Sequence, residues 1–281
     1  KALIILKSKT IKKRPVALKI KTGKLRHTFM QKNTVKILDA AFNLREKEQE
    51  IVKKYDFLQQ SLFFDFFGDP IRNSKGWKVD VLKNLALKIN SGSTPKGGSK
   101  VYVEKGVTFL RSQNVLRNQV LLDDVVYIDA DTHDNMSKSS VFNGDILITK
   151  TGRLNTENSS LGRAAMFTGI DNSANVNGHV YLIRLKENVN NQFVLFLLTT
   201  NEYRNYIRSI CVGGIDKRQI NKKHLEKFPV ILPPEELQDS FIERLKLIKT
   251  QKALAQKSLK KSDDLFQNLL QKAFKGELTA S

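Results

Sequence analysis

The feature that most constrains the fold is an uninterrupted seven-residue repeat between residues 235 and 274. Side chains of one stripe recur there at alternating steps of four and three residues, with Lys252 and Ser262 in two of the places. The apolar members are Phe241, Leu245, Ile248, Ala255, Leu259, Phe266, Leu269 and Ala273. A period of 3.5 residues sustained over about five heptads is typical of a coiled-coil seam. Roughly 40 residues make a helix about 60 Å long, so this seam needs a second long helix as its partner.

Residues 39–68 supply that second helix. Their apolar positions recur at three- and four-residue steps and are Ala41, Leu44, Ile51, Tyr55, Leu58, Leu62 and Phe66. Gly68 and Pro70 end the helix, because glycine tolerates a left-handed turn and proline cannot continue a helix. Pro233 and Pro234 precede the helix predicted over 235–278. We expect the two helices to pair as an antiparallel coiled-coil stalk.

Residues 69–234 have a different pattern. Short β-rich runs at 107–111, 125–128, 145–149, 164–168 and 179–185 are separated by clusters of Gly, Asn, Asp and Ser, and helical periodicity appears at 192–200 and 202–210. The predicted fold class is therefore α+β, with one globular domain between the two helices.

The charge is strongly positive but unevenly distributed. The formal net charge is +20, and residues 1–38 contain 12 Lys or Arg and no acid. Residues 39–68 sum to −2, residues 69–234 to +8 and residues 235–281 to +2. We expect residues 1–38 to be a poorly ordered basic tail, either simply solvated or a phosphate-binding arm. The +8 of the globular part points more directly to a polyanionic partner.

Several classes of protein are disfavoured. Cys211 is the single cysteine, and no stretch approaches the ~20 apolar residues of a membrane span, so we expect a cytoplasmic protein. The four histidines, His27, His133, His179 and His224, have no paired metal-ligand spacing. The sequence contains no phosphate-binding glycine-rich loop and no recognisable nucleophile elbow. It therefore predicts no catalytic residue, metal site or cofactor in this chain.

Seven segments, taken in order, resemble the specificity subunit of type I restriction-modification systems, in particular its second half. They are 60–70 with Gly76-Trp77, 91–95, 109–115, 144–152, 161–164, 233–238 and 273–278. The resemblance implies a non-catalytic subunit that reads one half of a split DNA target through a recognition domain, with long helices acting as a spacer. It also implies partners that methylate, translocate and cleave DNA, and S-adenosylmethionine, ATP and magnesium would belong only to them.

Residues 1–38 stand where that family has a first recognition domain, and they are too short for one. The chain therefore resembles a half-subunit or a truncated product. A half-subunit would need to pair with a copy of itself to rebuild the two-domain arrangement, and its target would then tend to be palindromic.

Candidate DNA contacts lie in polar segments that follow predicted strands. Phosphate contacts need Lys or Arg, whereas base reading needs polar side chains that reach a groove. The candidates are Lys96, Lys100, Arg111, Ser112, Gln113, Asn114, Lys150, Thr151, Arg153, Asn155, Asn158, Arg163, Lys217, Arg218 and Lys222. We expect phosphate contacts from Lys96, Lys100 and Lys150, and base reading within 111–118, 153–163 and 213–222.

Other interpretations of these residues stay open at the level of sequence. The lysines around Gly97-Gly98 could be solvated residues of a plain turn, part of 111–114 could cap a turn, and 217–218 could be ordinary surface charge. For the whole chain, the alternatives are a recognition domain detached from a fused restriction-methyltransferase and a coiled-coil interaction protein.

Overall fold

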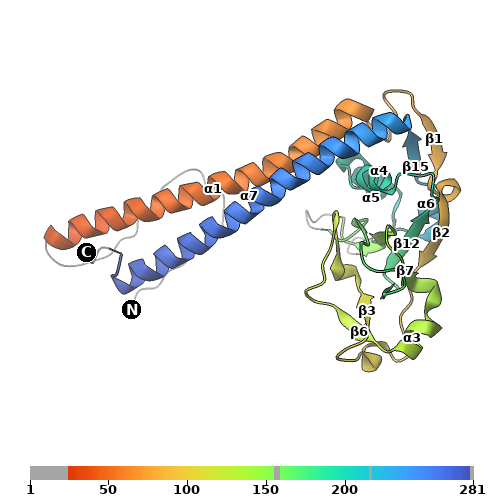
Figure 1. Cartoon of the computed structure of the whole chain (residues 1–281), viewed down its shortest axis with the longest axis horizontal. Helices are drawn as coiled ribbons and strands as arrows, with labels where there is room; N and C mark the ends of the chain where they lie inside the picture. Colours follow the sequence, from red (N-terminus) through yellow and green to blue (C-terminus); the bar gives the residue numbers. More distant parts are fainter. Residues whose placement is uncertain (1–24, 155–158, 215–216, 279–281) are drawn as a thin grey trace. The chain divides into compact units, whose positions relative to one another are not determined.

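The computed structural model describes residues 25–154, 159–214 and 217–278, with side chains from residue 32 onward (Figure 1). The chain divides into two compact units. One comprises the chain up to Gln59 together with the chain from Leu245, and the other comprises Gln60–Arg244. No helix in the described ranges is long and apolar enough to cross a membrane.

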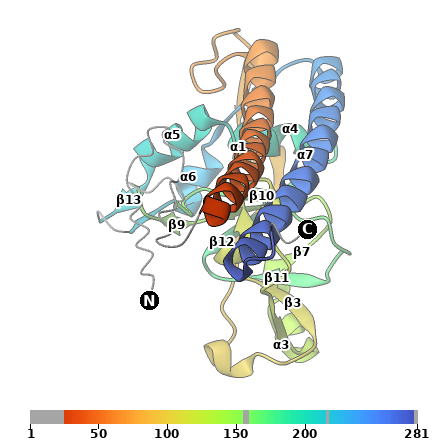
Figure 2. The same ribbon diagram turned by 90° about the vertical axis from the view of Figure 1, so that its left-hand side faces the viewer.

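The first unit contains most of two long helices, whose remaining turns belong to the second unit. Helix α1 spans Leu25–Phe67 and helix α7 spans Glu235–Lys275, and they lie side by side in both views (Figures 1 and 2). Every predicted seam position of α7 from Leu245 to Ala273 is buried or half-buried, including Lys252 and Ser262. The predicted coiled-coil seam of α7 is confirmed.

Contacts between the helices establish the antiparallel direction. The ring centroids of Phe42 and Phe266 are 6.0 Å apart. The Arg45 Nε lies 2.8 Å from Asp263 Oδ1, and Ser258 Oγ donates to Glu48 Oε1 at 2.7 Å. Further along α1, Asp56 pairs with Lys252. Residues nearer the C-terminal end of α1 thus contact residues nearer the N-terminal end of α7. The predicted antiparallel pairing is confirmed.

The seam of α1 contains Ala41 and Tyr55 of the predicted stripe, but three other members of that stripe lie outside it. Leu44, Ile51 and Leu58 are 44%, 45% and 46% exposed. The buried or half-buried series is Leu38, Ala41, Arg45, Glu48, Val52, Tyr55 and Gln59, which keeps the same four-three spacing. Leu44, Ile51 and Leu58 each directly precede a seam position, and the prediction included them because they are apolar. The seam is partly polar, which fixes register at a cost in stability.

Helix α1 also begins earlier than predicted. It starts at Leu25, whereas the expected tail extended to residue 38. Val35 and Leu38 are half-buried, so the side of the helix facing α7 continues into the basic segment. Lysines on the solvent side of a helix do not prevent it from forming. Residues 1–24 of the predicted tail lie outside the described residues.

The second unit is the predicted α+β domain, and its regular elements match the sequence pattern. Strands β3 (Val107–Leu110), β6 (Val126–Ile128), β8 (Ile146–Thr149), β10 (Ala164–Met166) and β12 (Val180–Leu185) lie within or overlap the five predicted runs. Helices α4 (Asn191–Leu198) and α5 (Asn201–Ile210) occupy the two predicted helical segments. The shorter elements are α2 Leu82–Leu85, α3 Ala130–Asn135, α6 Lys222–Glu226, and the 3-10 helices η1 Gly98–Val101, η2 Ser112–Asn114 and η3 Ser137–Ser139.

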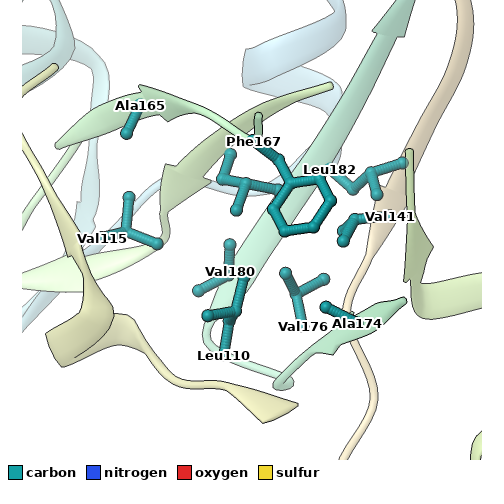
Figure 3. Close-up of a cluster of buried hydrophobic side chains, with 10 residues drawn as sticks. Leu110, Val115, Val141, Ala165, Phe167, Ala174, Val176, Val180 and Leu182 are labelled. Carbon is teal, nitrogen blue, oxygen red and sulfur yellow. The ribbon is translucent and has the colours of Figure 1, made fainter. Parts of the chain in front are cut away.

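Two four-stranded sheets form the body of this unit. One has the order β10-β8-β12-β2, with β2 at Ala86–Ser91, and is antiparallel. The other has the order β6-β3-β11-β7, with β11 at Ala174–Val176 and β7 at Ser140–Val141, and pairs β3 with β11 in parallel. Their side chains meet in a core of ten buried residues, among them Phe167, Val176 and Leu182 (Figure 3).

The chain enters and leaves this unit at one place. Strand β1 (Lys78–Val81) pairs antiparallel with β15 (Pro229–Leu232). An aromatic cluster joins the ends of the two long helices to α4. It contains Phe63 and Phe67 of α1, Phe241 of α7, and Phe193 and Phe196 of α4, with ring centroids 5.0–6.0 Å apart. Aromatic pairs at this separation add to the stabilisation from buried area. Three shorter pairings complete the unit, made by β4 Val115–Leu116, β5 Gln119–Val120, β9 Thr151–Gly152, β13 Val212–Gly213 and β14 Arg218–Gln219.

Candidate nucleic-acid interface

The segment that carries the central predicted loop is anchored by a buried ion pair. Asp145 is 1% exposed, and its two carboxylate oxygens accept from Arg184 Nε and Nη2 at 2.8 Å each. The backbone N–H of Phe142 also donates to this carboxylate, and the Arg184 guanidinium lies 3.8 Å from the Phe142 ring centroid. The hydrogen bond to Asp145 is the main reason that the pKa of Arg184 is raised. This pair fixes the start of β8 against β12.

Lys150 follows β8, and its ammonium group points into the domain. It donates to the Gly178 carbonyl at 2.5 Å and to Ser91 Oγ, and it lies 4.3 Å from the Tyr181 ring centroid. Burial lowers the pKa of Lys150. A phosphate contact by Lys150 stays a prediction, and it would require the ammonium to be shared with these groups or to leave them.

The three-stranded sheet β13-β14-β9 brings two of the predicted base-reading segments together. Gly152 is the register partner of Arg218, and Gly213 is paired with Arg218 from the other side. The Ile220 N–H donates to the Lys150 carbonyl at 2.9 Å and extends this pairing. Segments 153–163 and 213–222 are separated by 49 residues in the sequence, and this small sheet brings them together. We call this sheet with its two attached segments the loop platform.

The first of these loops folds back on Gly152. A Cβ atom at this position would lie 2.3 Å from the backbone nitrogen of Leu161, so only glycine fits. Ser160 Oγ donates to the Thr151 carbonyl at 2.7 Å, and Arg163 Nε donates to the Ser159 carbonyl at 3.1 Å. Arg153 is exposed at the beginning of the loop. Asn155 and Asn158 lie outside the described residues.

Most of the polar side chains of residues 111–114 bind other groups within the domain. Asn114 is 1% exposed, accepts from the Arg111 N–H at 2.8 Å, and donates to the carbonyls of Leu121 and Asp124. Arg111 Nη2 and Gln113 Nε2 both contact the Asp124 carboxylate, at 3.2 and 2.9 Å. The hydrogen bond from Gln113, followed by the charge of Arg111, lowers the pKa of Asp124. Asn114 therefore caps a turn, and Arg111 and Gln113 would contact DNA only by exchanging an exposed partner, while Ser112 is half-buried.

Lys96 and Lys100 are exposed beside η1, where Gly97 and Gly98 have positive φ angles of 97° and 58°. The turn closes through a hydrogen bond from the Gly98 N–H to the Pro95 carbonyl at 3.0 Å. Val103, just after η1, bridges to Tyr127 of β6. The turn that carries the two lysines thus leads into the β6-β3-β11-β7 sheet, which shares no strand with the β13-β14-β9 sheet of the loop platform in the described ranges.

The second loop carries the remaining predicted residues. Lys217 is exposed, and Arg218 is half-buried, with Nη1 3.4 Å from the Cys211 carbonyl. Lys222 is exposed on α6 and lies 3.8 Å from Glu226. Lys217 and Lys222 are therefore available to a polyanion, whereas Arg218 is partly held by the domain.

Metal-ligating groups do not gather in the part of the chain that the structure describes: no three of its His, Cys, Asp and Glu side chains come together. His133 is buried, and its Nδ1 lies 2.5 Å from Asn175 Oδ1. His224 lies beside Asn221, whose side chain caps α6. Both histidines have structural neighbours in the domain.

Comparison with known proteins identifies the family. The family described as "Type I restriction modification DNA specificity domain" matches residues 74–261, which include the whole loop platform and much of α7. The chain belongs to this family. The specificity subunit of the type I restriction enzyme StySPI from Salmonella potsdam is 25% identical over 221 residues, which is 75% of this chain and 46% of that protein. The chain thus spans about half the length of this curated relative.

Solved structures of specificity subunits share the fold. The HsdS subunit from Thermoanaerobacter tengcongensis has a TM-score of 0.52 at 20% identity, covering 89% of this chain and 59% of that one. The S subunit of a type I system from M. genitalium has a TM-score of 0.51 at 14% identity, covering 86% and 60%. A third structure, which concerns complex assembly and conformational transition of the type I R-M system, contains a chain with a TM-score of 0.62 at 19% identity. The match covers 90% of this chain and 60% of that one.

Sequence reasoning about this specificity chain missed the arginines of α5. Arg204 and Arg208 are half-buried, and their positive charges act on one another together with that of Arg163. In the sequence they are two arginines on an amphipathic helix, which is an ordinary pattern for a surface helix. Their one-helical-turn spacing was the available signal, but only the fold places them beside Arg163.

Proposed function

We propose that this chain is the DNA-recognition subunit of a type I restriction-modification complex and carries no catalytic residues of its own. It would read one half of a split target and direct methylation and cleavage by partner subunits. Membership of the specificity family supports this proposal. The loop platform is the observation that links this proposal to particular residues, because its paired strands join two polar, basic loops.

A rigid sheet with polar loops is suited to recognition. Loops that bind partners are typically held by a rigid scaffold, and base edges are read by polar side chains held at fixed positions. Here Asp145 and Arg184 fix β8, and Gly152 lets the first loop fold closely against β9. We therefore assign base reading to polar side chains within 153–163 and 213–222, and phosphate contacts to basic side chains such as Lys96, Lys100 and, within the second segment, Lys217.

The binding part of this proposal is tested by measuring affinity for a duplex of mixed sequence at several salt concentrations. Each phosphate contact should add about −0.9 to the slope of log K against log salt, so several contacts give a steep slope. Lys100→Gln and Lys217→Gln should each flatten the slope by about this amount. A flat slope for the unaltered chain would instead favour a coiled-coil interaction protein.

The partner proposal concerns an exposed apolar stripe on the coiled-coil unit. On α1 the stripe comprises Ile37, Leu44, Ile51 and Leu58, which are spaced by seven residues and 39–46% exposed. On α7 it continues with Leu247, Leu254 and Leu265, which are 48–69% exposed. Each of these residues directly precedes a seam position. Because the helices are antiparallel, positions one residue before the seam lie on the same side of the pair.

We propose that this face receives helices of the methyltransferase subunit. Seven-residue spacing suits a further helix, and an exposed apolar patch of this kind is typical of an interaction site. Leu44→Glu combined with Ile51→Glu should weaken co-purification with the cognate methyltransferase at least tenfold while leaving the DNA salt slope unchanged. Lys53→Glu, on the opposite side of α1, is the matched control. If the double variant assembles normally, the face has another role.

A further inference from the structure

Helix α5 packs directly against the end of the first loop of the platform. A Cβ atom at Gly162 would meet Ile207 of α5 at 2.9–3.7 Å, so the loop and the helix are in contact there. Tyr203 and Ile207 are buried and hold α5 to the domain. Arg163 is the next residue of the loop and therefore lies beside α5, the helix that carries Arg204 and Arg208.

Positive charge gathers at this contact. Arg204 and Arg208 are separated by four residues and so lie on one side of α5, about 6 Å apart along its axis. The pKa of Arg204 is lowered mainly by burial and then by the charges of Arg208 and Arg163, in agreement with the contact between Gly162 and Ile207. The acid of α5, Glu202, lies two residues before Arg204 and is therefore turned to the far side of the helix.

A fourth arginine extends this cluster at the N-terminal end of α5. Arg117 donates to Asn201 Oδ1 at 3.2 Å and to the Thr199 carbonyl. Its neighbour Asn118 donates its N–H to the Ala164 carbonyl at 2.8 Å, which ties the 111–120 segment to the strand that follows Arg163. The cluster thus joins the helix, the first loop and the β4–β5 hairpin.

We propose that Arg163, Arg204 and Arg208, with Arg117 at one end, bind the phosphate backbone of the DNA strand that passes the first loop. This assignment rests on the proposed function and locates a phosphate-contact surface beside the base-reading loops. Guanidinium groups suit this role because they bind phosphate oxygens in pairs.

The test is the salt dependence of binding to a 30-base-pair duplex of mixed sequence, measured by fluorescence anisotropy with the full chain. Arg204→Gln and Arg208→Gln should each reduce the magnitude of the log–log slope by about 0.9. Arg204→Lys and Arg208→Lys keep the charge and should retain the slope. Arg72→Gln is the matched control, because Arg72 is 86% exposed in the turn after α1 and its loss should leave the slope unchanged.

Two further measurements separate phosphate contact from other roles. The sequences selected from a randomised duplex pool should be the same for Arg208→Gln as for the unaltered chain, because phosphate contacts carry no direct sequence information. The thermal unfolding midpoint of Arg208→Gln without DNA should stay close to that of the unaltered chain, which shows that a reduced slope reflects a lost phosphate contact and not partial unfolding.

An unchanged slope in both Gln variants would overturn this inference while leaving the proposed function intact. A changed set of selected sequences would also overturn it, because it would assign base reading to α5. If the unaltered chain shows no salt-dependent DNA binding, the proposed function itself fails. If Arg204→Gln does not fold, Arg208→Gln and the two Lys variants decide the outcome.

Discussion

At the scale of single residues, many charged and polar side chains of the globular unit hold the scaffold of the site. Asp145, Lys150 and Asn114 all lie in motifs that resemble family segments, and all three are engaged inside the domain. Arg153, Lys217 and Lys222 lie in the two segments of the loop platform and are exposed. Scaffold and proposed readout residues are therefore interleaved, often only a few positions apart.

The buried Asp145–Arg184 pair leads to the first stability prediction. Asp145→Asn should lower the free energy of unfolding of the globular unit by about 3–5 kcal/mol, because the Arg184 charge loses its buried partner. Urea unfolding followed by circular dichroism measures the change. Asp123→Asn, at an exposed carboxylate, should change it by less than about 0.5 kcal/mol. A similar small effect for Asp145→Asn would contradict this role.

Tyr203 leads to a prediction about pH. Its ring is buried, its hydroxyl donates to the Pro229 carbonyl at 2.9 Å, and burial raises its pKa well above 10.0. The unfolded chain therefore releases this proton first, so stability should fall as pH rises above about 10. Tyr203→Phe should cost about 1 kcal/mol at pH 7 and reduce the alkaline loss.

The measurement is urea unfolding at pH 7, 10 and 11 for both chains. Tyr127→Phe is the control, because that variant should keep the full alkaline loss of stability. Equal pH dependence in Tyr203→Phe and the unaltered chain would contradict the assignment.

The sequence predicted residue types near the site better than it predicted their orientation. Arg111, Ser112, Gln113 and Asn114 are all polar residues after a strand, and the pattern cannot tell which of them caps the turn. The Asn114 side chain donates to the carbonyls of residues 121 and 124, which come near it only when the loop is folded. The contact of Gly162 with Ile207 likewise joins segments whose proximity no local pattern encodes.

At the scale of elements, the period of a helix was easier to predict than its facing side. The seam of α7 was predicted correctly because a single stripe of that helix follows the four-three spacing without a break. On α1 the more apolar stripe, Leu44, Ile51 and Leu58, lies one residue away from the actual seam. The partner helix selects the side, through pairs such as Glu48 with Ser258 and Asp56 with Lys252.

A pair of substitutions on α7 tests this seam. Leu259→Gln should destabilise the coiled-coil unit by about 2–3 kcal/mol, because it removes an apolar side chain from the seam and puts an amide in its place. Leu254→Gln, at a position 58% exposed, should change stability by less than about 0.5 kcal/mol. Thermal unfolding monitored by helical circular dichroism measures both. Equal losses would mean that the stripe containing Leu254 is packed as tightly as the seam.

At the scale of the whole molecule, the two units divide the proposed work. The globular unit carries the loop platform and the α5 arginines, and the coiled-coil unit carries a seam and an exposed apolar stripe. The α+β class and the long helices were predictable from periodicity, and the antiparallel pairing from the position of one domain between the two helices. The positions of the loops relative to one another required the sheet pairings, which join residues far apart in sequence.

The central claim is that this chain determines which DNA sequence its complex modifies. The most direct measurement is genome-wide sequencing of methylated sites in cells that carry the cognate methyltransferase with this chain, without it, or with Arg153→Gln. We expect methylation at one defined sequence that requires the chain, and reduced or altered methylation with Arg153→Gln but not with Arg72→Gln. Methylation of the same sites with and without the chain would contradict the claim.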